Sequence, residues 1–259
     1  MRAMILAAGL GTRLRPLTDD RPKALVEVAG RTLLEITLAR LRSFGVDEVI
    51  VNAHHFSGRI VDYLKAHNNF GIKVEVSLEE ELLDTGGGLK KAEHFFSGSR
   101  QEPFILHNVD VLSSIDLGEM VRFHNENGAL ATLAVQQRAS SRQLLFDESG
   151  QLCGRRAGNV AEAIHPRSQN RDMGHPEFED AENPQALAFS GIHVLSPQIF
   201  SKLEEEGAFS IISAYLRLAA EGEKILAFRA DGSDWRDLGK PESIRQAEEE
   251  IASGSYSAV

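Results

Sequence analysis

The sequence is poor in cysteine and in long apolar runs. Cys153 is the single cysteine of 259 residues, which excludes an internal disulfide framework and any metal site built from several thiolates. No stretch approaches the roughly 20 apolar residues that cross a membrane, and Met1–Leu6 is too short for the apolar core of a signal peptide. We therefore expect a cytoplasmic protein with no membrane partner.

Excess positive charge is also lacking. The chain has 28 Lys and Arg against 38 Asp and Glu, a formal net charge of −10. This balance argues against the broad basic surface that binds a nucleic-acid backbone, so we expect no nucleic-acid partner. Any anion must instead be bound locally, by a few concentrated cations. The 42% apolar and 25% charged residues are typical of a folded globular protein.

Apolar spacing alternates between strand-like and helix-like over the first half of the chain. Thr32 and Asp116 each stand as a helix cap with a glutamate three residues later. The segments with helical spacing are Thr32–Phe44, Ile60–Ala66, Leu89–Phe96 and Leu117–Asn125. The extended segments are Ala3–Ala7, Glu48–Asn52, Ile72–Val76, Phe104–His107 and Ala129–Val135. These repeated units predict an α/β fold, a Rossmann-like, mostly parallel mixed sheet with helices on both faces.

The alternation breaks in the second half. Leu144–Asp147 and Leu152–Arg155, joined by Glu148-Ser149-Gly150, have the pattern of a β-hairpin. Residues from about 158 to 184 are polar, which predicts either a long surface loop or a partly disordered segment. Order resumes with a strand at Ala186–Leu195, and a final helix begins at Pro241.

The strongest local signal is a glycine-rich loop after the first strand, Leu6-Ala7-Ala8-Gly9-Leu10-Gly11-Thr12-Arg13-Leu14-Arg15-Pro16, followed by Pro22-Lys23. The dinucleotide pattern fails because Leu14 stands where the third glycine belongs, and a P-loop is excluded because Gly-Lys-Ser/Thr is absent. Small residues trailed by Arg13, Arg15 and Lys23 suit a triphosphate, which needs directed N–H donors and full cations. The alternative is a plain turn with surface arginines.

These residues resemble the N-terminal motif of the sugar-1-phosphate nucleotidyltransferases, also called nucleotide-sugar pyrophosphorylases. The short length is similar to compact members such as the N-acetylmuramate uridylyltransferase and the mannose and heptose guanylyltransferases. The resemblance covers most of the chain and continues through four further fragments in the family's order. They are Thr85-Gly86-Gly87-Gly88, Leu106-His107-Asn108-Val109-Asp110, Phe189-Ser190-Gly191-Ile192 and Trp235-Arg236-Asp237-Leu238-Gly239.

The resemblance implies a role for each of these fragments. Asp110, at the carboxyl end of a strand where α/β sheets place ligand-binding groups, and Asp237 would hold Mg²⁺ together with phosphate oxygens and water. Arg13 and Lys23 would stabilise the α-phosphate and the departing pyrophosphate. The positions implied to contact the nucleotide or the acceptor are Ala7, Ala8, Gly9, Gly11, Thr12, Gly86, Gly87, Gly88 and Gly191. From the residues alone, Asp110 also suits a helix cap and Asp237 a solvated loop.

We expect the chain to transfer a nucleoside monophosphate from an NTP, UTP or GTP favoured, to a sugar 1-phosphate. It would act as a monomer or small homo-oligomer with one domain over residues 1–259. Residues 1–136 would bind the nucleotide, residues 137–234 the acceptor beneath a hairpin and loop extension, and residues 235–259 would form the metal loop and last helix.

Two alternatives remain. Asn108-Val109-Asp110 could be a degenerate D-x-D motif of a glycosyltransferase that uses a nucleotide sugar. Val109 stands where the family usually has Gly, and a side chain here would crowd the sugar or metal, as in a catalytically silent nucleotide-binding subunit. Two residues have weaker indications, Glu162 as a ligand of sugar hydroxyls and Trp235 as a core anchor.

Overall fold

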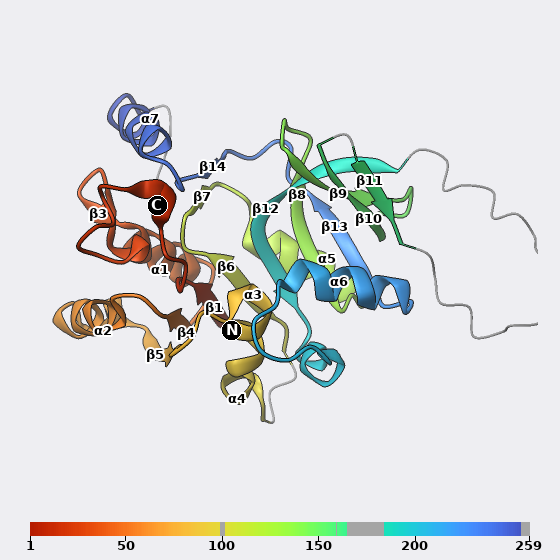
Figure 1. The fold of residues 1–259 in the computed structure, drawn as a ribbon, viewed down its shortest axis with the longest axis horizontal. Helices are drawn as coiled ribbons and strands as arrows, with labels where there is room; N and C mark the ends of the chain where they lie inside the picture. The colour runs from red at the N-terminus through yellow and green to blue at the C-terminus, as the bar shows by residue number, and fades with distance from the viewer. Residues whose placement is uncertain (99–101, 159, 165–183, 255–259) are drawn as a thin grey trace, which may run out of the picture.

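A mixed β-sheet forms the centre of the molecule (Figure 1). The computed structural model describes residues 1–98, 102–158, 160–164 and 184–254. Strands β6, β1, β4 and β5 lie side by side in that order and are parallel. Strand β12 is antiparallel to β6, β8 and β9 and so joins the parallel half to the rest of the sheet. The ten strands that the described residues contribute are β1 (Arg2–Leu6), β4 (Glu48–Ala53), β5 (Lys73–Leu78), β6 (Phe104–Asn108), β8 (Ala131–Gln136), β9 (Arg142–Phe146), β10 (Leu152–Ala157), β11 (Val160–Ala163), β12 (Gln185–Leu195) and β13 (Ile225–Arg229).

Helices cover both faces of this sheet (Figure 1). A separate apolar cluster lies between the sheet and the helices on each face. Helices α1, α2, α5 and α7 contribute to one cluster, and α3, α4 and α6 contribute to the other. Their bounds are α1 (Leu33–Ser43), α2 (Ser57–Ala66), α3 (Asp84–Lys91), α4 (Glu93–Phe96), α5 (Leu117–Asn127), α6 (Ile211–Ala220) and α7 (Pro241–Ala252). The predicted Rossmann-like α/β fold is confirmed.

The two predicted helix caps are present. The Oγ1 atom of Thr32 accepts a hydrogen bond from the Glu35 N–H at 3.1 Å, at the start of α1. The Oδ1 atom of Asp116 accepts one from the Glu119 N–H at 2.8 Å, at the start of α5. Each cap satisfies an N–H group that would otherwise have no partner in the first helical turn.

The predicted hairpin is formed by β9 and β10, which pair antiparallel. The long loop expected over residues 158–184 begins differently, because residues 160–163 form β11 and pair with β10. Most of the remaining loop, residues 165–183, lies outside the described residues. Two short sheets flank the main one and were not predicted: β2 (Glu27–Val28) with β3 (Arg31–Thr32), and β7 (Val111–Ser113) with β14 (Trp235–Asp237).

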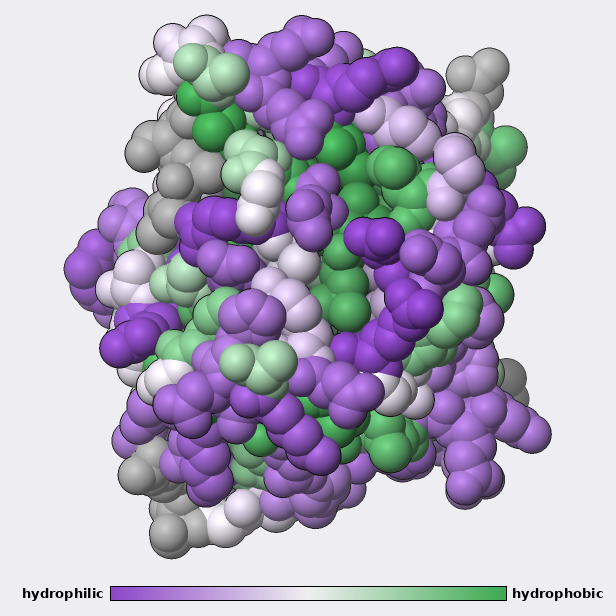
Figure 2. Space-filling view, turned by 90° about the vertical axis from the view of Figure 1, so that its left-hand side faces the viewer, coloured by the Kyte–Doolittle hydropathy of each residue, from purple (hydrophilic) through white to green (hydrophobic). Residues whose placement is uncertain are grey.

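Figure 2 views the molecule from the left of Figure 1, the side on which α1, α2 and α7 lie. Hydrophilic residues cover most of this face, and apolar residues form a strip down its middle (Figure 2). Within the described part of the chain, no helix has the length and apolar character needed to cross a membrane.

Candidate active site

Two cavities meet at the carboxyl end of β6. The smaller has a volume of about 410 Å³ and opens beside the glycine-rich loop after β1. The larger has a volume of about 850 Å³ and lies between β12, the β9–β10 hairpin, α6 and β14. Asn108 and Asp110 line both cavities. A molecule in one cavity therefore meets a molecule in the other at Asp110.

The smaller cavity is lined by the first part of the predicted nucleotide loop. Ala7, Ala8 and Gly9 are on its wall, as expected. The Ala7 N–H is already used, because it donates to the Oδ1 atom of Asn52 at 2.7 Å. Neither Gly11 nor Thr12 is among the described residues that line the two cavities. Gly11 has a φ of +66°, which favours glycine, and its carbonyl accepts a hydrogen bond from Thr18 at 2.9 Å.

The three consecutive glycines are part of a helix, because α3 begins five residues before the helical segment predicted from Leu89. Gly86, Gly87 and Gly88 are buried in helix α3 and are not among the described residues that line the smaller cavity. The N–H groups of Gly86 and Gly87 both point to the Phe209 carbonyl, at 2.9 and 3.4 Å. A Cβ on Gly86 would lie 2.2 Å from the Phe209 ring, and one on Gly87 would lie 2.3 Å from the Gly207 carbonyl oxygen. The close approach that these glycines permit is therefore made by the protein's own chain.

Four further residues line the smaller cavity, and only Thr85 among them belongs to a family fragment, whereas the other three have no sequence signal. The four are Asn52, Leu82, Asp84 and Thr85. Asn52 is 2% exposed and donates through Nδ2 to the Oε1 atom of Glu79 at 2.7 Å. Glu79 in turn accepts the Leu83 N–H at 3.1 Å. This chain of hydrogen bonds fixes the loop after β1 relative to the start of α3.

Lys23 and Asp110 form an ion pair where the two cavities meet. Their side chains are 12% and 15% exposed. Lys23 is at the start of a 3₁₀ turn, Lys23–Leu25, directly after Pro22. Val109, before Asp110, is 3% exposed and packs in the apolar cluster beneath. Val109 also lines the smaller cavity, but its low exposure leaves little of its side chain in the open space.

Asp237 is brought to Asp110 by strand pairing. This corrects the expectation that a metal loop begins at residue 235. Asp237 is the last residue of β14 and is paired with Val111 of β7. The Leu238 N–H donates to the Asp110 carbonyl at 2.8 Å, and the Gly239 N–H donates to Asp237 Oδ1 at 2.7 Å. Asp110 and Asp237 both line the larger cavity.

The two arginines of the glycine-rich loop have different positions. The Arg13 guanidinium lies against Gly239, because a Cβ on that glycine would be 2.9 Å from Arg13 Nη2 and 2.6 Å from Asp237 Oδ1. Arg13 is therefore close to the carboxylate of Asp237. Arg15 is 70% exposed and pairs with Asp19 at 3.5 Å, so it faces away from the predicted triphosphate.

The wall of the larger cavity is built on β12. Gly191 lines it, as expected, with a φ of +74°. A Cβ there would lie 2.8 Å from Val111 and 2.9 Å from the Asn108 amide nitrogen. The missing side chain thus lets β12 approach the turn that carries Asp110. Glu162 also lines this cavity, at its far end.

Trp235 packs against the apolar cluster that α1, α2, α5 and α7 cover, as expected of a core residue. It is only half-buried, however, and also lines the larger cavity. Its indole N–H donates to the Ser190 carbonyl at 2.7 Å, and the Arg138 guanidinium stacks on its ring at 3.5 Å. Arg138 also donates to the Phe189 carbonyl at 2.7 Å. Burial lowers the pKa of Arg138, and the nearby charge of Asp237 opposes this shift.

A buried histidine supports the turn from below. His107 is fully buried, and its Nδ1 donates to the Asn108 carbonyl at 2.8 Å. Its Nε2 has no hydrogen-bond partner among the described residues. Burial lowers the pKa of His107 to about 4, so the ring is neutral at physiological pH. It therefore positions Asn108 without adding charge beside Asp110.

Comparison with known proteins agrees with this geometry. The model of the nucleotidyl transferase family matches residues 2–144. An N-acetylmuramate alpha-1-phosphate uridylyltransferase of Caulobacter vibrioides is 32% identical over 253 residues, covering 96% of each chain. A probable mannose-1-phosphate guanylyltransferase of Arabidopsis thaliana is 31% identical over 93% of this chain, which spans 62% of that relative's length.

Solved structures share the fold. A UDP-glucose pyrophosphorylase complexed with UDP-glucose has a TM-score of 0.75, 19% identity and 98% coverage of both chains. The inositol-1-phosphate CTP transferase of T. maritima has a TM-score of 0.73 and 16% identity, covering 98% of this chain and 96% of its own. Together with the family match and the 32% identical relative, this likeness leads to one conclusion. The chain belongs to the nucleotidyl transferase family and is a nucleotidyltransferase.

Proposed function

We propose that this enzyme transfers the nucleoside monophosphate of UTP or GTP to a sugar 1-phosphate, giving a nucleotide sugar and pyrophosphate. The observation that carries the proposal is the meeting of the two cavities at Asn108 and Asp110. We assign the nucleotide to the smaller cavity and the acceptor to the larger. Relatives named for uridylyl transfer and for guanylyl transfer support the two candidate bases.

We propose that Asp110 and Asp237 hold Mg²⁺. Carboxylate oxygens suit this hard cation, which keeps several ligands from substrate phosphates and water rather than from protein. Both carboxylates reach the same cavity, and the described residues contain no cluster of three or more metal-binding side chains. Two protein ligands fit an ion completed by phosphate. Bound there, Mg²⁺ would neutralise charge on the reacting phosphates.

The proposed reaction needs no protein nucleophile. An oxygen of the acceptor phosphate attacks the α-phosphorus of the NTP, forming a new P–O bond. The bond from the α-phosphorus to the bridging oxygen of the β-phosphate breaks, and pyrophosphate takes that electron pair. Positioning and charge stabilisation supply most of the acceleration in such a transfer.

Two positively charged side chains are placed to stabilise the negative charge on the reacting and departing phosphates. Lys23 lines the nucleotide cavity beside Asp110, where the α-phosphate would sit. We place Arg13, beside Asp237, near the phosphates that depart. Residues 1–136 would thus serve the nucleotide, residues 137–234 the acceptor, and residues 235–259 would supply the second carboxylate. We propose that the enzyme works in the cytoplasm as a monomer or small homo-oligomer.

The test is pyrophosphate release with four NTPs against a panel of sugar 1-phosphates, with Mg²⁺ and with a chelator. We expect release only with the metal, only with an acceptor, and fastest with UTP or GTP. Asp110→Asn and Asp237→Asn should abolish release, while Asp62→Asn, on the exposed side of α2, should not. Release without an acceptor sugar, or undiminished release by either site variant, would reject the proposal.

The glycosyltransferase alternative predicts no pyrophosphate release in this assay, and no product at all, because the assay contains no nucleotide sugar. A glycosyltransferase consumes a nucleotide sugar and forms a nucleoside diphosphate, never pyrophosphate. The family match and the cation beside Asp110 disfavour it.

A further inference from the structure

One peptide group, between Leu6 and Ala7, is held on both sides where β1 ends and the glycine-rich loop begins. Its carbonyl oxygen accepts the Val109 N–H at 3.2 Å, and its N–H donates to Asn52 Oδ1 at 2.7 Å. Val109 directly precedes Asp110, and all five residues line the smaller cavity. The peptide group therefore connects the turn that carries Asp110 with the end of β4.

A side chain binds the Ala7 N–H because the backbone of β4 has another partner at this point. The Ala53 carbonyl, next along β4, accepts the Glu79 N–H at 2.8 Å. The primary amide of Asn52 has an acceptor and donors like those of a peptide group. It therefore continues the hydrogen bonding between β4 and β1 past the last paired residues. A buried N–H group without a partner would be costly here.

Glu79 determines which way the Asn52 amide faces. Its Oε1 atom accepts from Asn52 Nδ2 at 2.7 Å, and its Oε2 atom accepts the Leu83 N–H at 3.1 Å. A carboxylate can only accept hydrogen bonds, so the amide must present its NH₂ group to Glu79 and its oxygen to Ala7. Both side chains are nearly inaccessible, at 2% and 5% exposure. One orientation of the Asn52 amide is thus specified.

Gly88 leaves the space that this pair occupies. A Cβ on Gly88 would lie 2.7 Å from Asn52 Nδ2 and 2.8 Å from Glu79 Oε1. These atoms are the donor and the acceptor of one hydrogen bond, so the added carbon would displace at least one of them. The third glycine of the run therefore accommodates the Asn52–Glu79 contact, as the first two accommodate residues 207–209.

We propose that Asn52 is a positioning residue for nucleotidyl transfer, supported by Glu79 and Gly88. It acts through the Leu6–Ala7 peptide group, which it holds beside the turn that carries Asp110. In this way it sets the position of the glycine-rich loop relative to the reaction centre. The ligand that depends on it is the nucleoside triphosphate. This inference rests on the proposed function, because that function assigns the nucleotide to the smaller cavity.

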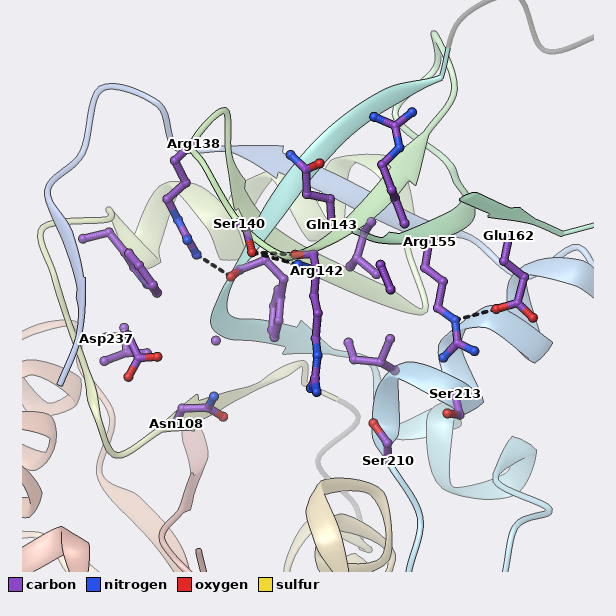
Figure 3. Close-up of a pocket in the computed structure, with 18 of the residues that line it drawn as sticks. Asn108, Arg138, Ser140, Arg142, Gln143, Arg155, Glu162, Ser210, Ser213 and Asp237 are labelled. Carbon is purple, nitrogen blue, oxygen red and sulfur yellow. Dashed lines mark hydrogen bonds and ion pairs between the residues drawn. The ribbon is translucent and has the colours of Figure 1, made fainter. Parts of the chain in front are cut away.

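The acceptor should be insensitive to Asn52. Asn52 is not among the described residues that line the larger cavity. In that cavity Asn108 and Asp237 lie at one end, and Glu162 and Ser213 lie at the other (Figure 3). A shift of the glycine-rich loop would leave most of this wall in place. The inference therefore predicts a defect in nucleotide binding and turnover without a defect in acceptor binding.

The first measurement is nucleotide binding without turnover. UTP and GTP are titrated calorimetrically with Mg²⁺ present and no acceptor. We expect Asn52→Ala to raise the Kd of the better nucleotide by about tenfold, because the Ala7 N–H and the Glu79 carboxylate each lose a buried partner. Asn125→Ala, on an exposed residue in the last turn of α5, is the matched control and should leave the Kd unchanged.

The second measurement is pyrophosphate release with the best acceptor of the panel described above. Asn52→Ala should raise the KM for the nucleotide in parallel with its Kd. Its kcat should fall by up to about 10²-fold, the scale expected when reacting groups are misplaced by roughly 1 Å. The KM for the acceptor should not change.

A paired exchange separates this role from general stability. Asn52→Asp alone brings two carboxylates together, and Glu79→Gln alone removes an acceptor needed by Asn52 or Leu83. The double variant Asn52→Asp/Glu79→Gln can restore all three hydrogen bonds, because the new amide donates to the new carboxylate and accepts the Leu83 N–H. We expect both single variants to weaken nucleotide binding and the double variant to recover most of the loss. Gly88→Ala, which displaces the pair without altering either side chain, should weaken binding as Asn52→Ala does.

Contrary results are distinguishable. A wild-type Kd and kcat in Asn52→Ala would show that the loop needs no such support. If Asn52→Ala does not fold, Glu79→Gln and the double variant give the same comparison. A double variant that regains stability in urea but not nucleotide binding would reduce the pair to a structural role, and an equal rise in the KM for the acceptor would contradict the specific effect. Absence of nucleotide binding in the wild type would instead reject the proposed function.

Discussion

Lys23 is ion-paired with Asp110 although 87 positions separate them in the sequence. Both side chains are mostly buried, so a metal ion that binds Asp110 must compete with the Lys23 ammonium. A nucleotide would relieve this competition, because its phosphates attract the ammonium. If the proposed sites are correct, we expect the pair to couple metal binding to nucleotide binding.

Lys23→Met tests this coupling. Without nucleotide, Mn²⁺ should bind the variant roughly tenfold more tightly, or about 1.4 kcal/mol, because the metal no longer competes with an adjacent ammonium for the Asp110 carboxylate. Turnover should nevertheless fall by about 10²–10³, the scale for losing one charge-stabilising group. Calorimetric titration with Mn²⁺ measures the first effect, with Lys65→Met on exposed α2 as the control. Weaker Mn²⁺ binding in Lys23→Met would contradict the competition.

Local signals in the sequence predicted most of the fold. The caps at Thr32 and Asp116 depend on residues three positions apart, and the β9–β10 hairpin depends on a short turn. The pairing of β7 with β14 was missed because each strand has three residues and they are far apart in sequence. Such short strands have no periodicity that a sequence pattern can detect.

The residues of the candidate site that belong to a sequence motif were predicted. The residues that only packing brings to the site were missed. Asp110, Asp237 and Lys23 are close together, as the resemblance implied. The glycine run lies within α3, and its predicted contact with the nucleotide stays a prediction, because glycines indicate a close approach without identifying what approaches. Arg142, which lines the larger cavity, was missed because the direction of its side chain depends on the register of the β9–β10 hairpin.

Gly86→Ala distinguishes packing from nucleotide contact. In an ordinary helix interior this change stabilises by about 0.5–1 kcal/mol. Here the added Cβ would meet the Phe209 ring at 2.2 Å and its carbonyl oxygen at 2.9 Å, so we expect a loss of about 1–3 kcal/mol. Gly58→Ala, in α2 with nothing within 4 Å of the added atom, is the matched control in urea unfolding. Normal stability with weakened NTP binding would instead support the original interpretation as a nucleotide contact.

Gly191→Ala tests how closely β12 must approach the turn that carries Asp110. A residue with a Cβ at a positive φ costs roughly 1–2 kcal/mol, and the contacts with Val111 and Asn108 should add about 1–3 kcal/mol. Gly30→Ala isolates the first cost, because its φ is +77° and nothing lies within 4 Å of the added atom. We also expect a raised KM for the acceptor in Gly191→Ala alone. Equal destabilisation of the two variants would show that the approach is not tight.

The last prediction concerns acid stability and depends on His124, which is away from the two substrate cavities. It is 2% exposed, with ring nitrogens 3.0 Å from Thr132 Oγ1 and 2.9 Å from Ser196 Oγ. Burial lowers its pKa from 6.5 to about 4. The unfolded chain therefore binds a proton at a higher pH than the folded chain does. The contribution to stability is complete above pH 6.5 and is lost as the pH falls towards 4.

At about 1.36 kcal/mol per pKa unit, His124 should account for about 2 kcal/mol of lost stability by pH 5. His124→Gln keeps a neutral polar side chain, so its unfolding free energy should fall less between pH 7.5 and pH 5 than that of the wild type. His94→Gln is a control in which the pH dependence of stability should change in the opposite direction. A hydrogen bond with Glu75 at 2.6 Å raises the pKa of His94. His94 stabilises the fold fully below pH 6.5, and this contribution is lost as the pH rises. The unfolding free energy of His94→Gln should therefore fall more steeply than that of the wild type between pH 7.5 and pH 5. Urea unfolding at the two pH values measures both slopes. A His124→Gln slope equal to that of the wild type would mean that folding does not lower the pKa of His124.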